Sequence, residues 1–169
     1  MLKILNKIRK VGIITEDVSR DASLESLGIE VKRHVDKIFS GSFAIREVDA
    51  GSCNGCELEV HALNNAYYDV ERFGVHFVAS PRHADALLVT GPVSHHMAVA
   101  LKRTYDATPE PKWVIAMGDC TINGGEFGVS YASVGGVDKV IPVDVVIAGC
   151  PPTPQALMHG ILALFRKVE

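Results

Sequence analysis

Apolar and polar positions follow two patterns along this chain, one typical of buried strands and the other of amphipathic helices. Short apolar runs have the length of buried strands at 43–48, 76–79, 86–90, 113–117 and 143–148. Between and after them, apolar residues recur at helical spacing in the segments that follow Cys56, Ser94 and Thr153. Ser94 and Thr153 suit helix caps, and Pro154 suits a first helical turn. The alternation predicts an α/β fold, a flavodoxin-like open parallel sheet with helices on both faces.

The beginning of the chain has a different pattern. Residues Leu2, Leu5, Ile8 and Val11 recur at helical spacing, while the basic residues Lys3, Lys7, Arg9 and Lys10 fall largely on the remaining surface. Such a segment can lie on an anionic membrane surface, dock on a partner or pack on its own domain. Residues 15–28 are polar without a clear period, and 29–38 form the helical part of an extended arm. We expect 1–42 to be an amphipathic segment and arm that packs on another subunit, and 43–169 to be the α/β domain.

Length and charge limit the possible functions. The chain has 169 residues, of which 47% are hydrophobic and 22% charged, which suits one substantial core. The formal net charge of -3 argues against the broad basic face of a nucleic-acid-binding protein. No apolar run reaches the about 18 residues that span a bilayer, and the start, MLKILNKIRK, lacks the apolar segment of a secretory signal. We therefore expect an intracellular protein, in which cysteines are more often metal ligands than disulfides.

The candidate chemistry lies in the 4 cysteines. Cys53 and Cys56 stand in DAGSCNGCELEV, between an expected strand and an expected helix, and glycines on either side allow a tight turn. Cys120 in MGDC and Cys150 in AGCPPTP each follow an expected strand. Because the carboxyl ends of parallel strands meet at one edge of a sheet, these residues are expected to converge there. The sequence therefore predicts a metal centre held by the thiolates of Cys53, Cys56, Cys120 and Cys150.

The spacing of the cysteines along the chain does not by itself decide which metal centre they bind. A structural zinc usually takes its thiolates as two close pairs, whereas this chain has one close pair and two single cysteines. Cysteine followed by proline, as in Cys150-Pro151, is typical of the last ligand in bacterial ferredoxin motifs. A 2Fe-2S centre also uses four thiolates. Inert buried cysteines fit poorly with glycine-rich turns. These observations favour one iron-sulfur cluster and leave zinc as the alternative, so 43–169 is expected to be an iron-sulfur-binding domain.

Several motifs in a fixed order give the chain a family resemblance between Phe43 and Phe165. The segments GSCNGCELE, SPRHADALLVTGPV, GDCTINGG and PVDVVIAGCPPTP resemble the small subunit of membrane-bound, energy-converting nickel-iron hydrogenases of the hydrogenase-4 and formate hydrogenlyase type. They are more distantly similar to the B subunit of respiratory complex I. The resemblance implies that Cys53, Cys56, Cys120 and Cys150 ligate a single 4Fe-4S cluster near the active site. In complex I relatives the first two cysteines are adjacent, so the intervening Asn54-Gly55 favours the hydrogenase type.

The resemblance also implies a function and a set of partners. A nickel-iron centre needs its own thiolates, and none remain after the cluster takes its ligands, so this chain is expected to be a non-catalytic electron relay in an oxidoreductase complex. Expected partners are the nickel-iron hydrogenase large subunit, a ferredoxin-like electron-transfer subunit and membrane subunits, at the cytoplasmic face of the cell membrane. The alternatives are a B-type subunit of a complex I-like quinone oxidoreductase and a zinc-stapled interaction domain.

Other side chains near these motifs have weaker assignments. Glu59 comes one helical turn after Cys56, which is consistent with a proton relay or with an ordinary solvent-facing helix residue. Glu57 is expected on the plain surface. The remaining candidates are charged or imidazole groups expected as caps, surface residues or interface groups: Arg82, His83, His95, His96, Asp119 and Glu126.

Overall fold

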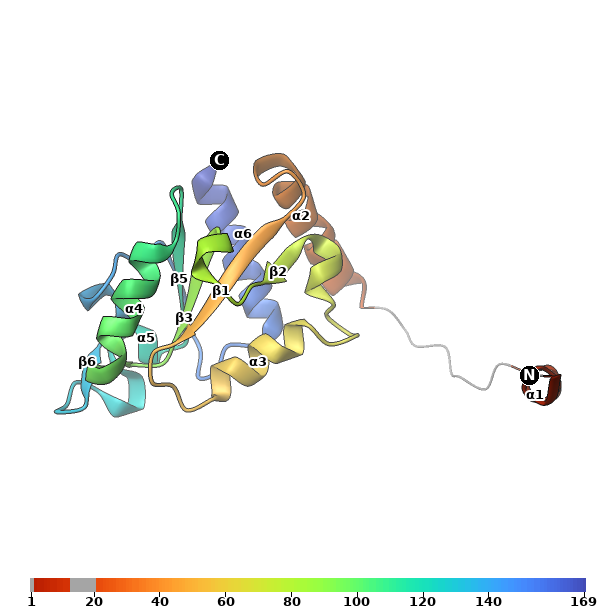
Figure 1. The fold of residues 1–169 in the computed structure, drawn as a ribbon, viewed down its shortest axis with the longest axis horizontal. Coiled ribbons are helices and arrows are strands. Elements are labelled where there is room, and N and C mark those ends of the chain that lie inside the picture. Colours follow the sequence, from red (N-terminus) through yellow and green to blue (C-terminus); the bar gives the residue numbers. More distant parts are fainter. Residues whose placement is uncertain (1, 13–20) are drawn as a thin grey trace.

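A computed structural model describes residues 2–12 and 21–169, and its centre is a five-stranded sheet (Figure 1). The strands lie in the order β2-β1-β3-β5-β7 and every neighbouring pair is parallel. Their bounds are β1 Phe43–Asp49, β2 Val75–Phe77, β3 Ala86–Thr90, β5 Trp113–Met117 and β7 Val145–Ile147. This order of parallel strands is that of flavodoxin-like sheets. The predicted fold class is confirmed.

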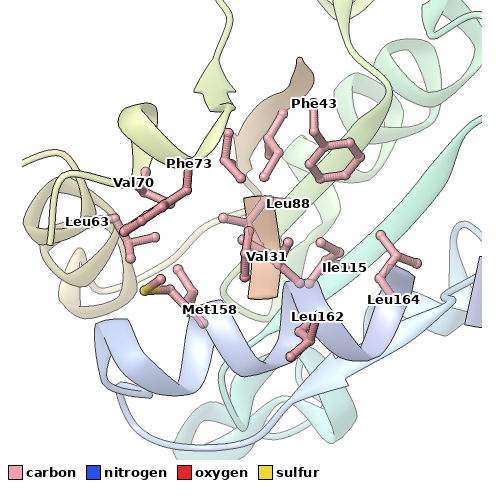
Figure 2. Close-up of a cluster of buried hydrophobic side chains, with 14 of the residues drawn as sticks. Val31, Phe43, Leu63, Val70, Phe73, Leu88, Ile115, Met158, Leu162 and Leu164 are labelled. Atoms are coloured by element: carbon pink, nitrogen blue, oxygen red, sulfur yellow. The ribbon is translucent and has the colours of Figure 1, made fainter. Parts of the chain in front are cut away.

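Helices cover both faces of the sheet (Figure 1). The core on one face includes side chains from α2 (Ala22–Ile38), α3 (Gly55–Leu63) and α6 (Pro154–Val168), and Figure 2 shows part of it. The core on the other face includes α4 (His95–Ala107) through its buried Leu101. Successive strand residues alternate between the two cores: Leu88 belongs to the first, and its neighbours Leu87 and Val89 to the second. This alternation follows from the two-residue period of a strand.

The predicted helix caps are present. The Ser94 hydroxyl accepts a hydrogen bond from the Met97 amide at 3.2 Å, and the Thr153 hydroxyl accepts one from the Ala156 amide at 3.2 Å. Each cap satisfies an amide that the first helical turn leaves without a partner. The two caps hold the starts of α4 and α6, and α6 begins just after Cys150.

Helix α2 differs from the expected arm. It begins at Ala22 rather than Ile29, and its Leu24, Leu27, Val31 and Val35 are buried in the core beside α6. This segment therefore belongs to the core of the domain, and its packing on another subunit stays a prediction. The sequence pattern breaks at Gly28, a residue that disfavours helices. In the structure a Cβ at Gly28 would lie 2.1 Å from the Phe73 ring, so this close packing explains the glycine inside the helix.

Helix α1 (Leu2–Val11) has the expected amphipathic pattern, and none of its residues is buried. Its apolar side chains are exposed, with Leu2 at 78% and Val11 at 48% of full exposure. Residues 13–20 of the expected arm lie outside the described residues. Within the described part of the chain, no helix is both long enough and apolar enough to cross a bilayer.

The glycine-rich segment between 121 and 137 contains short elements. Helix α5 spans Cys120–Asn123, and β6 (Ser133–Gly135) pairs antiparallel with β4 (Val93–Ser94) in a second, two-stranded sheet. Elements this short, in a segment rich in glycine, show no hydrophobic period from which they could be predicted. Single 3₁₀ turns lie at Val70–Phe73, Pro81–His83, Gly125–Phe127 and Val137–Lys139.

Candidate functional site

The fold brings the cysteines to the carboxyl edge of the sheet. Cys53 follows β1, Cys120 follows β5, Cys150 follows β7, and Cys56 lies in the first turn of α3. The thiol of Cys56 is within electrostatic range of the thiols of Cys53, Cys120 and Cys150. None of the cysteines is in a disulfide. The convergence that the sequence predicted is therefore present in the structure.

The thiols differ in their electrostatic environment. Burial raises the pKa of Cys56 to about 12, and the negative charge of Glu57 and the neighbouring thiols act in the same direction. Burial also raises the pKa of Cys120, and the neighbouring thiols of Cys150 and Cys53 raise it further. Thiolates crowded in this way repel one another. A bound cationic centre offsets that repulsion, because metal ligation requires the deprotonated form.

The loop of the first pair is held by local hydrogen bonds. The Asp49 carboxylate accepts from the backbone amides of Gly51 and Ser52, each at 2.7 Å. The Ser52 hydroxyl accepts from the amide of Asn54 at 3.1 Å, and Asn54 itself has a left-handed backbone with φ of 70°. Aspartate at the start of such a loop is typical of an Asx turn. Asp49 is thus a loop-fixing residue that the sequence reasoning missed, although its type and position could have indicated it.

The loops of the other two cysteines are tied to each other. The Asp119 carboxylate accepts from the Gly149 amide at 2.7 Å, and the Asp119 amide donates to the Gly149 carbonyl at 2.9 Å. The Gly118 amide donates to the Ile147 carbonyl at 2.8 Å. Asp119, expected as an interface group, therefore links the loop of Cys120 to the loop of Cys150. No sequence signal indicated this contact, because its partners are far apart along the chain.

Two glycines leave room for the sulfur atoms. A Cβ at Gly118 would lie 2.8 Å from the Cys56 sulfur, and one at Gly125 would lie 2.9 Å from the Cys120 sulfur. Both glycines also have positive φ, 94° and 53°, which other residues adopt at a cost of about 1–2 kcal/mol. The thiol donors and the space around them fit a cluster of several metal and sulfide atoms rather than a single ion, whose ligands must lie closer together. Across residues 2–12 and 21–169, no three His, Cys, Asp or Glu side chains are grouped closely enough to hold a single metal ion.

The two glutamates of α3 are placed differently from each other. Glu57, expected on the plain surface, is half-buried: its Oε1 accepts from the Ser52 hydroxyl at 2.6 Å and from the Thr90 hydroxyl. That expectation is wrong, because the first turn of α3 faces the end of β3, where Thr90 lies. Glu59 is also half-buried, and its role as a proton relay stays a prediction.

The remaining candidates lie on the surface. Arg82 and His83 are exposed in the turn before the amino end of β3, whereas the cysteines follow carboxyl ends of strands. His95 and His96 are exposed at the start of α4, and Glu126 is exposed after α5. A further surface was not expected from the sequence. Apolar side chains after Cys120 are 45–99% exposed, namely Ile122, Phe127, Val129 and Tyr131.

Comparison with known proteins places this cysteine-bearing region in a family. Residues 53–164 match the family described as NADH ubiquinone oxidoreductase, 20 Kd subunit. The chain belongs to this family. The match spans all four cysteine positions and most of the chain. It therefore covers the region in which the sequence motifs were found.

Two individual proteins are also similar to this chain. The probable membrane-bound hydrogenase subunit mbhJ of Pyrococcus furiosus is 49% identical over 121 residues, covering 72% of each chain. A chain in the structure of the membrane-bound sulfane sulfur reductase, an archaeal respiratory membrane complex, is 42% identical, with a TM-score of 0.68, covering 76% of this chain and 71% of that one. The predicted resemblance to membrane-bound hydrogenase small subunits and to complex I is confirmed.

A more distant structure shares the fold alone. A chain of an NAD+-reducing [NiFe]-hydrogenase is 18% identical with a TM-score of 0.58, and the match covers 75% of this chain and 92% of that one. The flavodoxin-like sheet is thus common to proteins whose sequences have diverged widely.

Proposed function

We propose that this chain is the electron-transfer subunit of a membrane-bound nickel-iron hydrogenase complex and carries one 4Fe-4S cluster on Cys53, Cys56, Cys120 and Cys150. The convergence of these thiols at one sheet edge is the observation that carries the proposal. Such a cluster, when bound, takes up and releases one electron at a time. The 49% identity to a hydrogenase subunit supports the choice of complex.

The residues of this chain have three tasks in the proposed relay. Asp49 and Asp119 fix the loops that present the thiols. Gly118 and Gly125 leave space beside two of the sulfurs. The half-buried Cys56 keeps one side of the centre away from water, whereas Cys53 and Cys150 are exposed at the surface that a partner can reach. Burial and hydrogen bonding of this kind tune the potential of a thiolate-held cluster.

The proposed partners follow from what the chain itself supplies. All of its cysteines are used by the cluster, so the nickel-iron site belongs to a large subunit. The exposed apolar side chains Phe127, Val129 and Tyr131, which follow Cys120, form the surface proposed for that subunit. A ferredoxin-like electron-transfer subunit and membrane subunits complete the proposed complex. The chain is proposed to lie peripherally at the cytoplasmic face of the cell membrane.

A second candidate function is favoured by one comparison. The 42% identity to a chain of an archaeal sulfane sulfur reductase supports a relay in a sulfur-reducing respiratory complex. The tasks of Cys53, Cys56, Cys120 and Cys150 are the same in both proposals. The two differ only in the reaction that the partner subunit catalyses.

The test is metal analysis and electron paramagnetic resonance on the chain, purified anaerobically together with the subunits that copurify with it. We expect about four irons and four sulfides per chain and a reducible 4Fe-4S signal. Hydrogen-dependent dye reduction that requires a copurified large subunit supports the hydrogenase, and reduction of polysulfide without hydrogen uptake supports the second candidate. One zinc per chain without iron would overturn both and leave a zinc-stapled interaction domain.

A further inference from the structure

A pair of half-buried carboxylates lies between the sheet and α3. Glu47 is on β1, where it continues the alternation of Phe43 and Ile45 toward the face covered by α2, α3 and α6. Glu57 is in the first turn of α3. One oxygen of each, Oε1 of Glu47 and Oε2 of Glu57, is buried and has no hydrogen-bond partner among the residues that the structure describes. Buried polar atoms without partners are rare, since each costs roughly 1–3 kcal/mol.

The charges around Glu47 come mainly from acidic groups. Burial raises the pKa of Glu47, and the negative charge of Glu57 raises it further. Arg46, its neighbour on β1, acts in the opposite direction, and Asp49 on the same strand adds to the rise. The Thr90 hydroxyl on β3 lowers the pKa slightly by hydrogen bonding. Two ionised carboxylates at this place would repel each other, because both side chains are only partly exposed to screening solvent.

One side of the pair opens to solvent. A groove of about 240 Å³ runs beside α3 and is lined by Glu47, by Val60, His61 and Asn64 of α3, and by Phe77 and Val78 at the end of β2. His61 is the titratable group that α3 adds to this groove, and the β2 side is apolar. Water in the groove can therefore reach the Glu47 carboxyl group.

The other side of the pair reaches the loop of the first two cysteines. The Thr90 hydroxyl, which is also close to Glu47, donates to Oε1 of Glu57. The Ser52 hydroxyl donates to the same oxygen at 2.6 Å and accepts from the Asn54 amide in the Cys53–Cys56 loop. Hydrogen bonds thus connect the Glu57 side of the pair to that loop.

We propose that Glu47 is a proton-holding site: as a neutral carboxylic acid it donates a hydrogen bond to the buried free oxygen of Glu57, and it exchanges its proton with water in the groove beside α3. One proton then gives both buried oxygens a partner and removes the like-charge repulsion. Exchange is balanced, because the proton that leaves the Glu47 carboxyl group is taken up by groove water and returned from it.

The site has a consequence for the proposed electron relay, and this consequence rests on the proposed function. An electron added near Cys56 increases the negative charge facing the acid pair. It therefore favours the protonated form of Glu47, so that electron arrival and proton uptake are coupled. The groove gives the proton a route that does not cross the surface proposed for the large subunit, which follows Cys120 on another loop.

The test is infrared spectroscopy of the purified full chain over a pH series, in H₂O and in D₂O. We expect a carbonyl stretching band of a protonated carboxylic acid that persists above the ordinary titration range of glutamate and shifts in D₂O. Glu47→Gln should remove this band, and Glu71→Gln, at an exposed position, should leave it unchanged. Glu57→Gln removes the neighbouring charge and should lower the pH at which the band disappears.

Two results would overturn the proposal. One is a wild-type spectrum whose protonated carboxyl band disappears within the ordinary titration range of glutamate, and the other is a band that survives in Glu47→Gln. If Glu47→Gln does not fold, Glu57→Gln tests the proposal instead. A Glu47 that does not interact with Glu57 would lose its proton at the same pH in the wild type and in Glu57→Gln. The band needs no metal, so it can be present even where iron analysis rejects the electron relay. Coupling is tested separately by the pH dependence of the cluster's midpoint potential, which should flatten in Glu47→Gln and not in Glu71→Gln.

Discussion

At the scale of single residues, the space beside the sulfurs is set by glycines. Gly118 has a φ of 94°, and a Cβ there would lie 2.8 Å from the Cys56 sulfur. Gly128 also has a positive φ, 59°, but a Cβ there would meet nothing within 4 Å. The two positions therefore separate backbone strain from collision with a thiol, and they give a matched pair of variants.

We predict that Gly118→Ala lowers the iron content of the purified chain to less than half of the wild-type value, because the methyl group displaces a ligand. Gly128→Ala should retain its iron, since a Cβ there meets nothing within 4 Å. Its backbone, with φ of 59° and ψ of -165°, lies in a region that other residues adopt at a cost of roughly 1–3 kcal/mol. Iron and sulfide analysis with parallel thermal unfolding distinguishes the two effects. Equal iron loss in both variants would attribute the effect to strain and would contradict a specific collision at Cys56.

Glu47 gives a prediction for stability as a function of pH. Its pKa is raised above the ordinary value of 4.5 in the folded chain. As the pH rises above 4.5, the unfolded chain loses this proton first, so the free energy of unfolding falls until the folded group also ionises. Glu47→Gln has no proton to lose. We therefore predict that its stability relative to wild type increases with pH through this window and is constant above it.

The measurement is urea unfolding of both proteins across the pH series, with Glu71→Gln as the exposed control. A stability difference that does not vary with pH would show that Glu47 titrates alike in the folded and unfolded chains. The same residue shows why sequence alone was insufficient here. A glutamate at the end of a strand gives no sign that α3 covers it, because that depends on contacts between elements distant in the chain.

At the scale of elements, α2 shows the limit of periodicity as a guide. The buried strands and the helices after Cys56, Ser94 and Thr153 were predicted because their patterns are uninterrupted. The start of α2 was missed because Gly28 interrupts the pattern, and the reason for Gly28 lies in the Phe73 ring, which comes from another element. Likewise, β6 was missed because its pairing with β4 joins two short segments without a local signal.

The packing of α2 leads to a test of where this helix belongs. Leu27 is 7% exposed in the core, whereas Ile29 on the same helix is 52% exposed. We predict that Leu27→Ala lowers the free energy of unfolding of the chain by about 2–4 kcal/mol, and that Ile29→Ala changes it by no more than about 0.5 kcal/mol. Denaturant unfolding of the chain without partners measures both. If neither substitution matters, α2 is not docked on its own domain in solution.

At the scale of the whole molecule, the carboxyl edge of the sheet, where the cysteines lie, has some features that the sequence predicted and others that it did not. The convergence of Cys53, Cys120 and Cys150 follows from parallel topology, which the sequence pattern already indicated. The hydrogen bonds of Asp119 and Glu57 follow from the way that separate loops meet, which no local pattern encodes. In the proposed relay, electrons leave through a partner subunit, because the proposed cluster uses all the cysteines of the chain.

That surface gives the last prediction. Tyr131 is 99% exposed on the segment after Cys120, and Tyr67, in the turn after α3, is 52% exposed. Aromatic side chains at the centre of an interface often contribute 2 kcal/mol or more to binding, so Tyr131→Ala should weaken retention of the large subunit by about tenfold or more. Tyr67→Ala should leave it unchanged. Quantitative copurification from cells that produce the whole complex measures the effect, with iron content as the control for an intact centre. Full retention of the large subunit by Tyr131→Ala, with iron unchanged, would place the interface elsewhere on the molecule.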